Sequence, residues 1–105
     1  FILIQKKMAS RKDIINAFCE GTPKGKASSL SIDKAGNGTA LYSYATPIAY
    51  RDEQGNVFMT KKKFSQTTSV QQGALRRSCF VNELDNDEYK QKLRKEGVST
   101  SFSRL

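Results

Sequence analysis

The sequence predicts one α+β domain: an antiparallel meander of about three strands packed by a helix, with a short helix at the N-terminus and another at the C-terminus. The chain of 105 residues has the length of one domain. Strand-like apolar segments in its middle are separated by turn residues, and segments with helical spacing lie on both sides of them.

The N-terminal helix carries both a start and a stop signal. Residues 1–7 precede Met8 and are interpreted as an upstream extension or a cloning remnant, so the domain is placed at residues 8–97. Ser10 and Asp13 have the spacing of a capping box, and Gly21 ends the helix.

Three strands are expected between the helices. Residues 22–26 are predicted to form a loop, and the alternating segment 30–33 suits an edge strand that turns at residues 35–38. The segment 41–50 is the strongest strand prediction, with Pro47 breaking the ladder or forcing a bulge. A third strand is expected at residues 57–61.

Helices are expected to follow the sheet. The covering helix is predicted to begin near Ser69, with Thr68 or Ser69 as its N-cap. A second helix is predicted at residues 87–95 and stops at Gly97, because its acidic start and basic end complement the helix dipole. Residues 98–105 are predicted to form a flexible tail.

The net charge of the chain indicates which class of partner it could bind. Eighteen Lys and Arg against ten Asp and Glu give a net charge of +8 and a pI near 9.7. Such an excess attracts polyanions, which makes DNA or RNA the first partner to consider. The alternative is that the charge serves solubility, for which a small domain carries a net charge of roughly 2–8.

The residues that usually carry catalysis are scarce. The chain has no histidine, so the usual general base and the commonest transition-metal ligand are both missing. No enzyme activity, metal or cofactor is therefore expected. The two cysteines, Cys19 and Cys79, form no C-x-x-C pair and are expected to be reduced and buried in an intracellular protein. The apolar run at residues 1–4 is too short to span a membrane.

Basic and aromatic residues form the strongest candidate site. Proteins that hold single-stranded nucleic acid combine cationic tracks for phosphates with aromatic faces for bases. The candidates are Arg51, Lys61, Lys62, Lys63, Arg76, Arg77, Tyr42 and Tyr44. The two tyrosines are expected on one face of a strand, although alternating aromatics are also typical of cross-strand packing.

A hydroxyl triplet precedes the covering helix and allows two interpretations. Thr67, Thr68 and Ser69 either cap the helix or, together with its N-terminus, form an anion site.

Two segments resemble a known family. Residues 41–51 read LYSYATPIAYR, and residues 63–71 read KFSQTTSVQ ahead of Leu75-Arg76-Arg77. The pattern is similar to the "LYSYGTPIA" and "YSxTTSxHQ" motifs of small uncharacterised proteins of tailed bacteriophages and mobile elements, and the match covers about residues 26–80. Ala45 stands where that family commonly has glycine, and Gln71 where it often has histidine.

The resemblance implies a phage-type origin and a location in the host cytoplasm. The leading hypothesis is a nucleic-acid-associated accessory protein. The alternative is a protein-binding module that inhibits or modulates a host complex, because a basic surface also suits an acidic protein partner.

Overall fold

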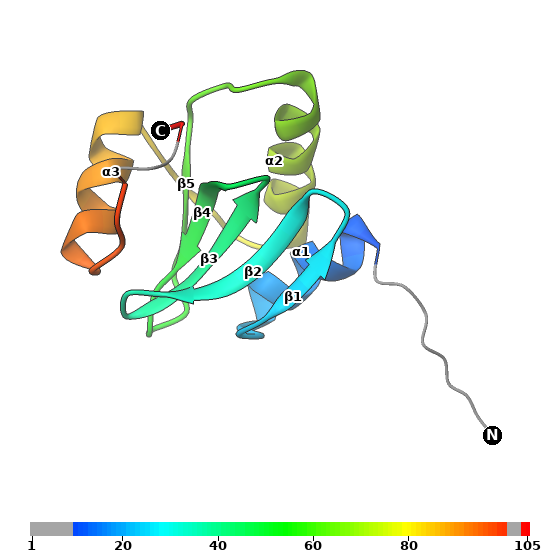
Figure 1. Cartoon of the computed structure of the whole chain (residues 1–105), viewed down its shortest axis with the longest axis horizontal. Coiled ribbons are helices and arrows are strands. Elements are labelled where there is room, and N and C mark those ends of the chain that lie inside the picture. The colour runs from blue at the N-terminus through cyan, green and yellow to red at the C-terminus, as the bar shows by residue number, and fades with distance from the viewer. Residues whose placement is uncertain (1–9, 101–103) are drawn as a thin grey trace.

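One sheet with helices on both faces forms the molecule (Figure 1). The computed structural model describes residues 10–100 and 104–105. The helices are α1 (Arg11–Glu20), α2 (Gln66–Ser78) and α3 (Asn86–Lys95). The strands are β1 (Gly25–Ala27), β2 (Leu30–Ala35), β3 (Gly38–Ser43), β4 (Thr46–Arg51), β5 (Val57–Thr60) and β6 (Asn82–Leu84).

The predicted three-stranded meander is wrong. The sheet has six strands in the order β1 to β6, with antiparallel pairs up to β5 and a parallel pair between β5 and β6. The segment 41–50, expected as one strand, contains the turn between β3 and β4. The predicted loop at residues 22–26 contains the start of β1, which pairs with β2 and removes β2 from the edge.

Two of the three additional strands arise from hairpin turns in which a residue other than glycine has the positive φ, and the third, β6, pairs in parallel with β5 after α2. Ser28 has a φ of 57° in the turn between β1 and β2, and Tyr44 has a φ of 59° in the turn between β3 and β4. Side chains rarely adopt this left-handed region, so neither residue signals a hairpin in the sequence. The turn at residues 35–38, where Gly36 supplies the positive φ of 54°, was predicted correctly.

The sheet separates two cores. On one face, α1 and α2 cover an apolar cluster that includes Ile15, Phe18, Leu41, Met59 and Leu75. On the other face, α3 covers a smaller cluster. The second cluster contains Ala40, Tyr50, Tyr89, Leu93 and Val98. Adjacent residues of β3 therefore point to opposite faces, as the pleat of a strand requires.

The helix boundaries follow local capping. Ser10 Oγ accepts a hydrogen bond from the Asp13 amide at 3.2 Å, and the Asp13 carboxylate accepts one from the Ser10 amide at 3.0 Å, which confirms the predicted capping box. The helix α2 begins before the predicted position, because Ser65 rather than Thr68 or Ser69 is its N-cap.

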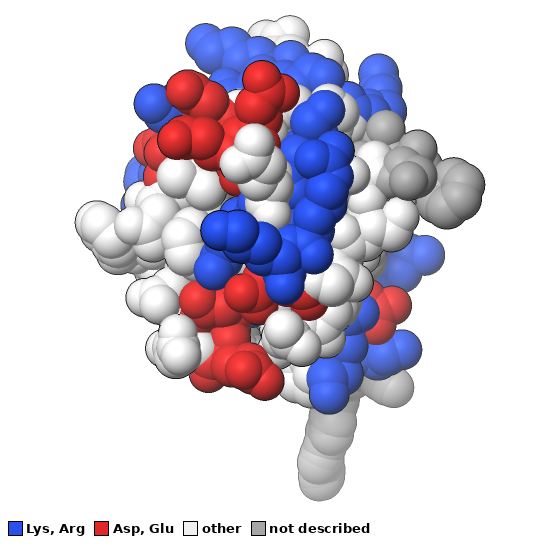
Figure 2. All heavy atoms as spheres, turned by 90° about the vertical axis from the view of Figure 1, so that its left-hand side faces the viewer, with Lys and Arg blue, Asp and Glu red and all other residues white. Residues whose placement is uncertain are grey.

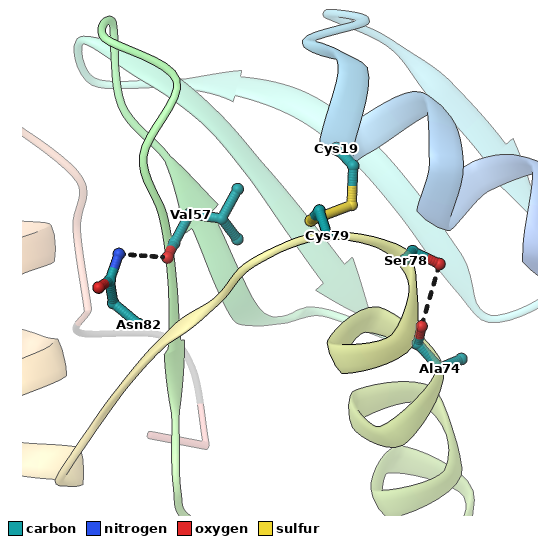
Figure 3. Close-up of a disulfide and its surroundings, with 6 residues drawn as sticks. All are labelled: Cys19, Val57, Ala74, Ser78, Cys79 and Asn82. Atoms are coloured by element: carbon teal, nitrogen blue, oxygen red, sulfur yellow. Dashed lines mark hydrogen bonds between the residues drawn. A yellow bond between two sulfur atoms is a disulfide. The ribbon is translucent and has the colours of Figure 1, made fainter.

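A disulfide joins α1 to the end of α2, so the expected reduced thiols are wrong (Figure 3). The Cα atoms of Cys19 and Cys79 lie 6.1 Å apart. The bond closes a loop between residues 60 positions apart in the sequence, which no sequence spacing rule predicts. Beyond Cys79 the chain returns to the sheet, where the Asn82 side chain donates to the Val57 carbonyl at 3.1 Å.

Parts of the predicted tail contact the α3 side of the sheet. Val98 is buried, and Leu105 packs against the second cluster. The Lys62 ammonium donates to the Leu105 carbonyl at 3.2 Å. The extension proposed at residues 1–7 lies outside the described residues. Within the part that is described, no helix is long and apolar enough to span a membrane.

Candidate nucleic-acid interface

Four adjoining hollows form a groove, here called the basic groove, which runs along the α1 and α2 side and continues past the β1–β2 and β3–β4 turns to the other face of the sheet, toward which Lys26 and Ser31 point. The first hollow lies between the start of α1 and the second half of α2, and the second lies between Arg11 and the first half of α2. Arg11 lines the first, second and third hollows. The third hollow lies between the start of α2 and the β1–β2 and β3–β4 turns, and is here called the turn hollow. Tyr44 lines it and the fourth hollow, which reaches Lys26.

The two strained turns lie together at one end of the sheet (Figure 1). The Tyr44 amide donates to the Ser29 carbonyl at 2.7 Å, which ties one turn to the other. The Tyr44 side chain is 67% exposed, although a large aromatic ring gains more from burial. Residues held at a positive φ gather at functional sites, and these two, Ser28 and Tyr44, border the same hollow.

A network of buried polar side chains supports the turn hollow. Gln71 is 1% exposed; its Oε1 accepts from Ser43 Oγ at 2.6 Å, and its Nε2 donates to Ser29 Oγ at 2.9 Å. Ser43 Oγ also lies 3.5 Å from Thr68 Oγ1. These bonds fix the amide of Gln71 and connect β3, α2 and the β1–β2 turn.

The groove is lined by cations. Arg11, Lys12 and Arg77 line its first hollow, and Lys26 lines its last. Within residues 10–100 and 104–105, no carboxylate lines any of the four hollows. No ion pair of these four side chains is found among the same described residues.

A family model describes nearly the whole domain. It is that of a family of unknown function (DUF8033), and it matches residues 5–99. The chain belongs to this family. No curated protein and no solved structure matches the chain.

Three of the six cations predicted as ligands of nucleic acid have partners within the described part of the protein. The Arg76 guanidinium binds the Glu83 carboxylate through two nitrogens at 2.9 and 3.2 Å. The Lys61 ammonium lies 3.9 Å from the Asp85 carboxylate. The Lys62 ammonium donates to the Arg104 carbonyl at 2.8 Å and lies 5.3 Å from the centre of the Phe64 ring.

Lys63 and Arg77 are exposed, and only Arg77 lines a hollow of the groove. The structure therefore brings Arg77 and Tyr44 to the groove and places the lysine triplet beyond it. Nucleic-acid binding by Lys61, Lys62 and Lys63 stays a prediction.

Two further candidates lie elsewhere. Tyr42 is half-buried on the α3 side of the sheet, where desolvation by burial, and secondarily the Asp33 charge, raise the pKa of its hydroxyl. Tyr42 and Tyr44 therefore share no face. Arg51 ends β4 beside Gly21 and Gly55, and lines a separate hollow together with carboxylates.

The three residues of the hydroxyl triplet, Thr67, Thr68 and Ser69, have different surroundings. Thr68 is buried in the polar network, and the Ser69 amide donates within the helix to the Ser65 carbonyl. Thr67 is exposed and lines the turn hollow. The triplet thus does not converge on one anion, but Thr67 contributes a hydroxyl to the groove.

Arg11, Lys12 and Lys26 were not predicted as site residues from the sequence. A signal was present, because Arg11 and Lys12 follow the N-cap of α1 directly. Cations in the first turn oppose the helix dipole and are better placed in the last turn.

The opposite side of the molecule has a different charge pattern. Figure 2 shows blue and red side chains interleaved on the α3 side. The Lys92 ammonium lies 3.9 Å from the Asp52 carboxylate, 3.3 Å from that of Glu96, and 4.6 Å from the centre of the Phe58 ring. The charge of Lys92 is therefore balanced by neighbouring carboxylates.

Proposed function

We propose that this protein binds nucleic acid along the basic groove, as a non-enzymatic accessory protein of a bacteriophage or mobile element. The observation that carries the proposal is the lining of the groove: four cations and, within the described residues, no carboxylate. A groove of one charge sign concentrates counter-charged ligands, and a phosphate backbone is the polyanion that extends along such a track.

The placement of Arg11 and Lys12 supports a ligand rather than stability. Arg11 and Lys12 lie where the dipole of α1 is positive, so they raise the positive potential instead of offsetting it. Arg77 lies on the other wall of the first hollow. A phosphate between these side chains would balance charges for which the described protein supplies no partner.

The two segments that resemble phage proteins meet at this groove. Tyr44 comes from the first segment, and Thr67 and Gln71 from the second. All three line the turn hollow. Because residues so far apart in the sequence converge on a surface hollow, we assign the resemblance to a shared binding site as well as to the fold.

A host protein is the second candidate partner. Phe80 is 82% exposed directly after the disulfide, and Val70 is 49% exposed on α2. Exposed apolar side chains are typical of protein contacts when they form a patch. Phe80 and Val70 do not form such a patch, and the groove beside α1 is lined by cations. Nucleic acid is therefore the stronger proposal for the partner.

Titration of labelled oligonucleotides over a salt series tests the function. Phosphate contacts make log affinity fall linearly with log salt, and four contacts to a single strand give a slope of about −3. We expect such a slope for DNA or RNA in fluorescence anisotropy. Absence of binding at low salt would overturn the proposal and favour the protein partner.

A further inference from the structure

We infer that the turn hollow receives one unpaired nucleobase, stacked on Tyr44, so that the protein selects single strands over duplexes. This inference rests on the proposed function and deepens it. The hollow has a volume of about 270 Å³ and is lined by Tyr44, Ser29, Thr67, Gln71 and Arg11, among others. An aromatic ring, hydroxyl groups and a cation thus surround one space, which are the groups that hold a nucleotide.

Tyr44 presents its ring from an anchored backbone. Its φ of 59° turns the chain sharply, and its amide is held by the Ser29 carbonyl at 2.7 Å. Glycine would relieve the backbone strain at this position, but it would offer no ring. An exposed aromatic group on an anchored backbone offers a stacking face with little loss of backbone freedom on binding.

The base edge meets hydroxyl groups with defined roles. Ser29 Oγ accepts from the Gln71 amide, so its own proton remains to be donated to a base carbonyl. The amide of Gln71 is held at both ends and keeps this serine oriented. The Thr67 hydroxyl can donate or accept, so the hollow tolerates more than one base.

Cations lie on both sides of the hollow. Arg11 lines the turn hollow itself and the two hollows toward Arg77. Lys26 lines the neighbouring hollow on the other side of Tyr44. A strand that places one base on the ring would thus carry its phosphates toward Arg11 in one direction and Lys26 in the other. A duplex keeps its bases stacked inside and can use the cations alone.

Substitution of Tyr44 tests the inference on the full chain. Tyr44→Asn suits the experiment because asparagine tolerates a positive φ, so the turn is retained. Loss of one base stack should weaken binding of a single-stranded 12-nucleotide DNA by about 5- to 100-fold, with the salt slope and duplex affinity unchanged. Tyr44→Phe should bind within about threefold of the parent, because phenylalanine keeps the ring.

Phe80→Ala is the matched control, since Phe80 is also an exposed aromatic residue but lines none of the groove hollows within the described residues. It should leave the single-strand affinity unchanged. Thermal melts of every variant verify that the compared proteins are folded.

Photocrosslinking locates the base directly. A 12-nucleotide DNA that carries 5-iodouracil should attach to Tyr44, as detected by mass spectrometry of the digested protein. Attachment mainly at Phe80 or on α3 would overturn the inference, as would Tyr44→Asn binding as tightly as the parent protein. If neither single strands nor duplexes bind, the proposed function itself fails; equal binding of both forms overturns the base site alone.

Discussion

The chain contains two Arg-Lys pairs that lie at opposite ends of their helices. Arg11-Lys12 occupies the first turn of α1, and Arg94-Lys95 the last turn of α3. The carbonyl end of a helix attracts cations by about 0.3–1 kcal/mol each, and the amide end repels them. Stability therefore accounts for Arg94-Lys95, whereas Arg11-Lys12 works against the helix that carries it.

The side chains near the two pairs also differ in charge. On the α3 side, the ammonium of Lys92, in the same last turn, lies near the Asp52 and Glu96 carboxylates and over the Phe58 ring, although no ion pair of Arg94 or Lys95 themselves is found among the described residues. The groove beside Arg11 has neither arrangement among the described residues. Carboxylates thus lie beside Lys92 on the α3 side, whereas none of the described residues that line the hollows beside Arg11 is acidic. The difference indicates where an anionic ligand would bind.

The largest expected effect concerns the disulfide that braces the groove side. Closing a loop of 60 residues between Cys19 and Cys79 should stabilise the domain by about 4 kcal/mol through loss of freedom in the unfolded chain. Cys19→Ala with Cys79→Ala should lower the free energy of unfolding by that amount in urea titrations, and the oxidised and reduced parent proteins should differ similarly. A difference below about 1 kcal/mol would show that the two sides owe their stability to packing alone.

A smaller effect is expected from Tyr89, which anchors the α3 side. Its hydroxyl donates to the Pro47 carbonyl at 2.6 Å, and burial raises its pKa well above the ordinary value near 10. Between the unfolded and folded pKa values only the folded state keeps the proton. The contribution of Tyr89 to the free energy of unfolding is therefore fully present below pH about 10. Above that pH it falls by up to about 1.4 kcal/mol per pH unit.

Tyr89→Phe isolates that contribution. At pH 9 the variant should be less stable by about 1 kcal/mol, because the Pro47 carbonyl loses its donor. At pH 11 the deficit should shrink, because phenylalanine has no proton to lose. Paired denaturant titrations at the two pH values measure the change. An identical deficit at both would show that Tyr89 does not titrate on unfolding in this range.

The helices were predictable because their signals are local. The capping box of Ser10 and Asp13 and the stop at Gly21 lie within one short segment. The strand count was not predictable, since two hairpins turn at Ser28 and Tyr44, residues that seldom adopt the required φ. Alternation alone placed Tyr42 and Tyr44 on one face, but the turn at Tyr44 separates them.

The candidate site was predictable only in part. Tyr44, Thr67 and Arg77 were recognised by residue type, and the structure brings them to one groove. The remaining cations of the groove are Arg11 and Lys12 from the first turn of α1 and Lys26 from β1. Only tertiary packing brings them to the groove. Cations next to one another in the sequence, such as Arg76 and Arg77, divide between an ion pair and the groove.

Substitution of the two Arg-Lys pairs tests most directly whether the α1 and α2 side of the molecule, rather than its net charge, binds nucleic acid. Arg11→Gln with Lys12→Gln and Arg94→Gln with Lys95→Gln remove the same charge from exposed side chains. In single-strand titrations over a salt series, the first pair should weaken binding at least about tenfold and flatten the slope by about 1.4, while the second changes affinity less than about twofold. Equal losses for both pairs would contradict binding by the α1 and α2 side.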